Sequence, residues 1–91
     1  MDIKLEKLLA RNSAADAHDV RQMKKALNRL GYYMPFEDVG ILGIPDAGLF
    51  AGLKKFQKDH NLPLTAEVRP NDQTMQMLQQ ELSKKKKGQY I

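Results

Sequence analysis

The chain has 91 residues, enough for one domain with one modest hydrophobic core and too few for a deep, walled active site. Lysine and arginine number 15 against 11 aspartate and glutamate, but the run Lys84 to Lys87 supplies the whole excess of +4, so the basicity belongs to a tail and not to a nucleic-acid-binding face. The sequence has no cysteine and no run near the ~20 apolar residues that cross a bilayer, which excludes disulfides, thiolate metal sites and a membrane span.

Residues 2–10 are predicted to form a short amphipathic helix. Leu5, Leu8 and Leu9 recur at i, i+3 and i+4, which places them on one helical face with charged residues between them. A helix of two turns needs a partner surface to be stable. The small and polar residues 12–18 indicate a connector.

The first long helix is predicted to begin at Asp19 and to end at Gly31. The carboxylate of Asp19 can accept from the free N–H groups of the first turn, and Gln22 completes a capping box. Apolar residues at spacings of 3, 4 and 3 then share one helical face, namely Val20, Met23, Leu27 and Leu30. Glycine ends a helix readily because it enters the left-handed conformation without steric cost.

A long loop over residues 32–45 follows this helix. Two prolines and two glycines interrupt any periodicity in it. Its three aromatic residues, which include Phe36, argue against simple disorder. Loops of this length inside small domains are usually functional or mobile.

The second long helix is expected to be capped by Asp46. Its apolar stripe consists of Leu49, Leu53 and Phe56. Gly52 lies in the helix interior at a cost of ~1 kcal/mol relative to alanine, which indicates close approach of another helix. Asn61 takes the helix-ending position, and Pro63 prevents continuation.

Apolar and polar residues alternate in the short segment 64–68, which lies between two prolines and is predicted to be extended. The last helix should begin near Pro70 and Asn71. Proline is tolerated at the first helical position, because the backbone N–H that it lacks would have no partner within the helix there. Its apolar face consists of Met75, Leu78 and Leu82, and the lysine run is expected to end it.

Catalytic chemistry finds no support among the residues. His18 and His60 lie far apart in the sequence and lack a second ligand at metal-site spacing, so no metal and no other cofactor is expected. The sequence has no Gly-x-Ser-x-Gly elbow and no cysteine nucleophile. Glu37 and Asp38 are adjacent carboxylates on a loop and are expected to be solvated charges. The chain is therefore predicted not to be an enzyme.

A helix-turn-helix is the nearest nucleic-acid-binding alternative. That motif joins its helices by a turn of 3 or 4 residues, whereas the whole segment 32–45 separates the helices here. Lys54, Lys55 and Lys58 give the second helix a basic edge, but aspartates bracket that helix. Specific nucleic-acid binding is therefore not expected.

Four short motifs occur in order along the chain. They are Leu30-Gly31-Tyr32, Phe56-Gln57, Leu62-Pro63-Leu64-Thr65-Ala66 and Pro70-Asn71-Asp72-Gln73-Thr74. With these motifs in this order and at these spacings, the chain resembles the peptidoglycan-binding domain, the three-helix module that tethers cell-wall enzymes to the bacterial wall. The resemblance covers roughly residues 19–82.

The helical pattern and the resemblance together imply an all-α fold: a compact three-helix module with a short extra N-terminal helix and a long loop between the first two long helices. We expect a helix and connector over 1–18, the domain over 19–82 and a basic tail over 83–91, as a piece of a longer protein. The resemblance implies a monomeric module of the cell envelope that binds peptidoglycan without catalysis and targets a linked domain to the wall.

A wall ligand presents hydroxyls, amides and free carboxylates, so a binder needs paired donors and acceptors and an aromatic surface. The residues that we expect to bind it are Tyr32, Tyr33, Asp46, Gln57, Asn61 and Thr65. In the alternative interpretation, the tyrosines pack within the domain and Gln57 satisfies backbone groups of the loop.

Two departures from the family pattern bear on binding. Residues Gly43 to Phe50 replace the usual Asp-Gly-x-Phe-Gly segment, and Ala66 stands in place of the turn glycine. The first change falls in the loop that would border the ligand. A second hypothesis is therefore a protein-interaction module on the same scaffold, inside a cytoplasmic or phage-associated protein.

Overall fold

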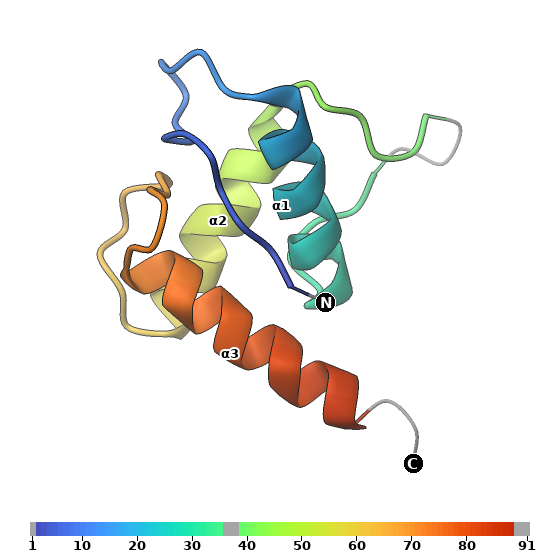
Figure 1. Cartoon of the computed structure of the whole chain (residues 1–91), viewed down its shortest axis with the longest axis vertical. Coiled ribbons are helices and arrows are strands. Elements are labelled where there is room, and N and C mark those ends of the chain that lie inside the picture. The colour runs from blue at the N-terminus through green and yellow to red at the C-terminus, as the bar shows by residue number, and fades with distance from the viewer. Residues whose placement is uncertain (1, 36–38, 89–91) are drawn as a thin grey trace.

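The computed structural model of the chain describes residues 2–35 and 39–88. These residues form three helices, α1 (Ala17–Arg29), α2 (Ala47–Asp59) and α3 (Gln73–Gly88). In Figure 1, α1 and α2 lie side by side and α3 packs across one end of the pair. The prediction of a compact all-α domain with three helices is confirmed. The expectations for Phe36, Glu37 and Asp38 fall outside the described residues.

The N-terminal segment is extended, and the helix predicted over residues 2–10 is wrong. Leu9 pairs with Val68 in an antiparallel bridge, with N···O distances of 2.8 and 2.9 Å. Ile3 and Leu5 are buried, whereas the residues that follow each of them are exposed. This alternation has the period of a strand. The leucine spacing used for the prediction omits the isoleucine that completes the strand pattern.

Asp19 holds this extended segment against α1. The N-cap of α1 is Asp16, whose Oδ1 accepts from the N–H of Asp19 at 3.1 Å, so the predicted cap at Asp19 is wrong. Asp19 is only 1% exposed, and its carboxylate accepts from the N–H groups of Glu6 and Lys7 at 3.1 Å. Gln22, the expected partner in the capping box, donates to a carbonyl of the same N-terminal segment.

We expect Asp19→Ala to lower the free energy of unfolding by about 2 to 4 kcal/mol, because two backbone N–H groups lose a charged acceptor inside the protein. Asp16→Ala removes only a helix cap and should cost ~1 kcal/mol. Urea unfolding followed by circular dichroism measures both values. Equal losses in the two variants would contradict the role of Asp19 as the anchor of the N-terminal segment.

Both predicted helix stops are confirmed. Gly31 has a φ of 89° and Asn61 a φ of 58°, the left-handed conformation that ends a helix. In each case the N–H of the next residue donates to a carbonyl of the last helical turn. The N–H of Tyr32 lies 2.7 Å from the carbonyl of Leu27, and that of Leu62 lies 2.8 Å from the carbonyl of Gln57. The chain therefore turns sharply after α1 and after α2.

The helix starts are set by aspartates. Asp46 caps α2 as predicted. Asp72 accepts from the N–H of Met75 at 2.9 Å, so α3 begins after Asp72 and not at the proline before it. The helix then continues to Gly88, through the lysine run that was expected to end it, because lysine is a good helix former.

One hydrophobic core joins the three helices to the N-terminal segment. Its fully buried members are Leu9, Val20, Met23, Ala26, Leu27, Leu49, Leu53, Phe56, Val68, Leu78 and Leu82. The apolar stripes predicted for the three helices lie in this core, with Leu30 partly exposed at its edge.

Gly52 is required because the chain that follows α1 touches α2 there. A Cβ at this position would clash with the carbonyl oxygen of Tyr32, whereas a Cβ at Gly48 in the same helix would make ordinary contacts with the Tyr33 ring at 3.4 Å and Asp46 Oδ1 at 3.6 Å. We expect Gly52→Ala to destabilise the domain by about 1 to 3 kcal/mol. Gly48→Ala should be neutral or stabilising by up to ~1 kcal/mol. Thermal unfolding of the two variants tests this, and a stabilising Gly52→Ala would contradict the close approach.

Candidate ligand-binding surface

The six residues predicted to bind a ligand do not form one site. The structure places Tyr33 and Asp46 at the start of α2. Tyr32 lies near the end of α2, where it contacts Asp59. The structure brings Gln57 and Thr65 together in a hollow beside the start of α3. Asn61 lines a second hollow next to it.

Tyr33 and Asp46 form a hydrogen bond with each other within the fold. Tyr33 is 6% exposed and its hydroxyl donates to Asp46 Oδ2 at 2.8 Å. The buried ammonium of Lys24 lies 3.2 Å from the same carboxylate and donates to the carbonyl of Ile44 at 2.6 Å. These contacts tie α1 to the loop that leads into α2.

The ionisation of this pair follows from its contacts. Burial, and then the hydrogen bond to Asp46, raise the pKa of Tyr33 to about 12. Burial also acts to raise the pKa of Asp46, but the hydrogen bonds from Tyr33, from the Leu49 N–H and from Lys24 outweigh it and hold that pKa below its ordinary value. The contribution of the Asp46 carboxylate to stability is therefore present above its ordinary pKa and is lost as pH falls through the lowered one.

Tyr32 covers the end of α2. Its hydroxyl donates to Asp59 at 2.7 Å. Its ring forms a T-shaped pair with the Phe56 ring, and the two ring centroids are 5.4 Å apart. Burial, followed by the hydrogen bond to Asp59, raises the pKa of Tyr32 to about 12. Tyr32 is half-buried, so its main contribution within the structure is to packing.

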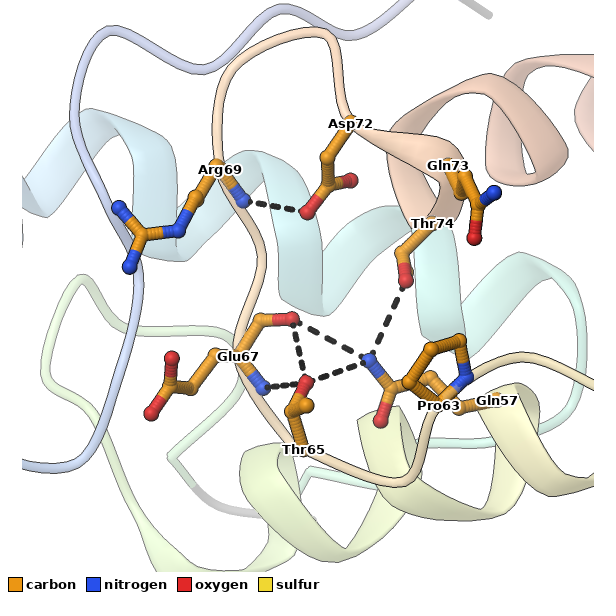
Figure 2. A pocket seen from close by; sticks show the side chains of 8 residues that line it. All are labelled: Gln57, Pro63, Thr65, Glu67, Arg69, Asp72, Gln73 and Thr74. Carbon is orange, nitrogen blue, oxygen red and sulfur yellow. Dashed lines mark hydrogen bonds between the residues drawn. The ribbon is translucent and has the colours of Figure 1, made fainter.

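Gln57 lies at the centre of a polar network between α2, the segment that follows it and α3. Its side chain is 1% exposed. The Nε2 group lies 3.2 Å from three acceptors, which are Thr65 Oγ1, the carbonyl of Glu67 and Thr74 Oγ1 (Figure 2). The Oε1 atom accepts from the N–H of Ala66 at 2.9 Å. Gln57 therefore fixes the wall of the hollow, and the backbone groups that it satisfies belong to the segment after α2 and not to the loop over residues 32–45.

The polar hollow has a volume of about 200 Å³. Its lining residues are Gln57, Pro63, Thr65, Glu67, Arg69, Asp72, Gln73 and Thr74 (Figure 2). Six of these were missed by sequence reasoning, namely Pro63 and the five from Glu67 onwards. A signal for two of them was present, because alternate residues of an extended segment share a face, so that Glu67 and Arg69 follow Thr65 on one side.

The turn at Ala66 keeps the shape that glycine would give it. Ala66 has a φ of 54°, in the left-handed region. Its N–H points to Gln57 and is held there by the 2.9 Å hydrogen bond. The replacement of the turn glycine therefore leaves the wall of the polar hollow in place.

The chemistry of the polar hollow suits hydrogen bonding to neutral groups. Two hydroxyls and two carboxamides lie beside one guanidinium and two carboxylates. Asp72 already accepts from two backbone N–H groups, those of Arg69 at 2.8 Å and Met75 at 2.9 Å. Within residues 2–35 and 39–88, no three His, Asp or Glu side chains gather closely enough to hold a metal ion.

A second hollow continues from the first along α3. It has a volume of about 290 Å³ and shares Gln73 with the polar hollow. Its lining residues are Asn61, Leu62, Gln73, Gln76, Met77 and Gln80. Four of these six carry a carboxamide, so we call it the amide hollow. Each carboxamide offers both a donor and an acceptor.

Comparison with known proteins identifies the family. The family model of the peptidoglycan binding domain matches residues 16–78. This range contains α1, α2, the first part of α3 and every residue that lines the polar hollow. Neither the curated proteins nor the solved structures give a match. Among the described residues, no helix is long and apolar enough to cross a membrane. The family match covers most of the chain, and the chain belongs to the peptidoglycan-binding domain family.

Proposed function

We propose that this domain holds peptidoglycan at the polar hollow and the adjoining amide hollow. The observation that supports this most strongly is the fixed geometry around Gln57. The buried carboxamide holds the hydroxyls of Thr65 and Thr74 in place before any ligand arrives. A preorganised set of donors and acceptors loses little entropy when a ligand binds.

The ligand groups that fit these hollows are sugar hydroxyls and acetamido or peptide amides. Such groups are neutral and pair with carboxamides and hydroxyls, which dominate the two linings. The polar hollow is smaller than the 300 to 1,000 Å³ typical of small-molecule pockets. Affinity for one soluble fragment should therefore be weak, near millimolar or about −4 kcal/mol.

The role that we propose is attachment without cleavage. Asp72 is engaged by backbone N–H groups and the threonine hydroxyls by Gln57, so these groups are not arranged as a nucleophile with its base. Family membership implies association with the cell wall. A monomeric domain of this kind would raise the local concentration of a linked domain at the wall.

Sedimentation with purified peptidoglycan sacculi tests this proposal. The wild-type protein should sediment with sacculi and release no soluble fragments from them. Arg69→Ala combined with Gln73→Ala should reduce apparent affinity roughly tenfold, because each lost hydrogen bond is worth about 0.5 to 1.5 kcal/mol. The matched control, Arg21→Ala with Asn12→Ala, removes an exposed guanidinium and an exposed carboxamide outside the lining of the hollow and should sediment like wild type. A folded wild type that stays in the supernatant, or equal losses in the two variants, would contradict the proposal.

A protein partner is the second candidate function, and one observation favours it. Four large apolar side chains of the loop before α2 are exposed, by 85% at Met34, 53% at Val39, 43% at Leu42 and 64% at Ile44. Exposed apolar groups that gather on one loop are typical of interaction surfaces. Ile44→Ser with Met34→Ser should leave sedimentation with sacculi unchanged if the wall binds at the two hollows and the loop serves a protein partner. Loss of sedimentation in that variant would place the wall ligand on the loop and contradict binding at the hollows.

A further inference from the structure

A third hollow lies on the exposed face of α2, on the other side of the segment that borders the polar hollow. It has a volume of about 520 Å³. Its lining residues are Ala51, Lys54, Lys55, Lys58, Asp59 and Leu64. We call it the basic hollow. Ala51 and Leu64 give it an apolar floor, and 51% of Leu64 is exposed.

The segment 63–65 separates the basic hollow from the polar hollow. Pro63 and Thr65 line the polar hollow, whereas Leu64 between them lines the basic one. Consecutive Cα atoms are about 3.8 Å apart, so the wall between the hollows is one chain segment thick. A ligand longer than one sugar ring can therefore lie across this segment and enter both hollows.

The two hollows carry opposite charge. The polar hollow has two carboxylates, on Glu67 and Asp72, against one guanidinium. The basic hollow has three ammonium groups against one carboxylate, and that carboxylate, on Asp59, accepts from the Tyr32 hydroxyl at 2.7 Å. None of the ion pairs formed within residues 2–35 and 39–88 uses Lys54, Lys55 or Lys58.

This charge difference decides where an acidic part of the ligand can bind. The stem peptide of peptidoglycan carries free carboxylates and small apolar side chains, whereas the sugars are mostly neutral. A carboxylate is repelled by the two acidic groups of the polar hollow and attracted by the three lysines beyond the segment 63–65. The small apolar side chains match the floor formed by Ala51 and Leu64.

We propose that the basic hollow binds the carboxylate-bearing stem peptide while the polar hollow takes the neutral part of the same ligand. This inference rests on the proposed function and adds a second subsite on α2. The lysines act by charge, and Leu64 supplies the apolar contact. The segment 63–65 then lies under the junction between the sugar and the peptide.

The test compares three probes on the intact protein. They are a disaccharide-peptide fragment with free carboxylates, the same fragment with its carboxylates amidated, and glycan strands stripped of peptide. The variant K54Q/K55Q/K58Q removes the lysines of the basic hollow. The control variant K4Q/K7Q/K25Q makes the same change of charge at exposed lysines elsewhere. Dissociation constants are measured by calorimetry at low and high salt.

Wild type and the control variant should bind the free-carboxylate fragment about 3- to 10-fold more tightly than the amidated one, with the difference shrinking at high salt. The variant without the three lysines should bind both fragments equally and should bind peptide-free glycan like wild type. A preference that persists without the lysines, or its absence in wild type, would overturn the inference and leave wall binding intact. Equal competition by polyphosphate of matched charge would also overturn it, because the hollow would then be a general anion surface. Failure of wild type to bind any of the three probes would overturn both proposals.

Discussion

Phe56→Ala is expected to lower the free energy of unfolding by about 3 to 5 kcal/mol. Phe56 is 0% exposed, and its ring forms a T-shaped pair with the Tyr32 ring, with centroids 5.4 Å apart, and lies against the His60 ring, with centroids 4.1 Å apart. Truncation leaves a cavity that rigid helices on both sides cannot fill. A domain of this size has a net stability of about 5 to 14 kcal/mol at 0.05 to 0.15 kcal/mol per residue, so the loss is a large share of the total.

Phe56→Leu is the matched control, because it keeps most of the buried volume and should cost less than half as much as the alanine variant. Chemical unfolding followed by circular dichroism gives both free energies. A melting temperature for Phe56→Ala within a degree or two of wild type would show that the ring is not part of the core.

Gln57→Ala is expected to cost about 2 to 4 kcal/mol of stability. The substitution leaves the N–H of Ala66 and the hydroxyl of Thr74 without their partner in a buried place. From the sequence alone, Gln57→Ala is expected to weaken wall binding and to spare the fold. The burial of Gln57 changes this expectation, because any loss of binding in that variant will include loss of structure.

Gln57→Glu separates shape from hydrogen bonding. The glutamate has the same size, but its ionised form cannot donate to the carbonyl of Glu67 as the Nε2 group does. Folding therefore favours the protonated acid and raises its pKa above the unfolded value of about 4.3. Relative to wild type at the same pH, the stability of this variant should be highest below that value and should fall as pH rises through the raised pKa. Stability equal to wild type at pH 7 would contradict the role of the Nε2 group.

The C-terminal ends of α1 and α2 and the start of α2 could be predicted because they depend on residues close in sequence. Gly31, Asp46 and Asn61 act through backbone groups within a few residues of themselves. The N-terminal segment could not be predicted in this way. Its conformation depends on Asp19 and Val68, which lie far along the chain from the residues that they contact.

The same distinction applies to the candidate surface. Gln57 and Thr65 could be predicted as neighbours, because the chain turns back at Asn61 directly after α2. The position of Thr74 depends on how α3 crosses α2, which no local pattern encodes. Residues 43 to 50, which depart from the family pattern, line none of the three hollows. They include the first residues of α2.

The most direct test of peptidoglycan binding at these hollows is a titration of the isotope-labelled protein with a disaccharide-peptide fragment of peptidoglycan, followed by nuclear magnetic resonance. The backbone amide signals that shift most should be those of residues that line the polar, amide and basic hollows, namely Gln57, Lys58, Leu64, Thr65, Glu67, Asp72, Gln73, Thr74 and Gln76. Signals from the outer face of α1 should stay in place. Shifts confined to α1 or to the loop before α2, or no shifts at millimolar fragment, would contradict the assignment of this surface.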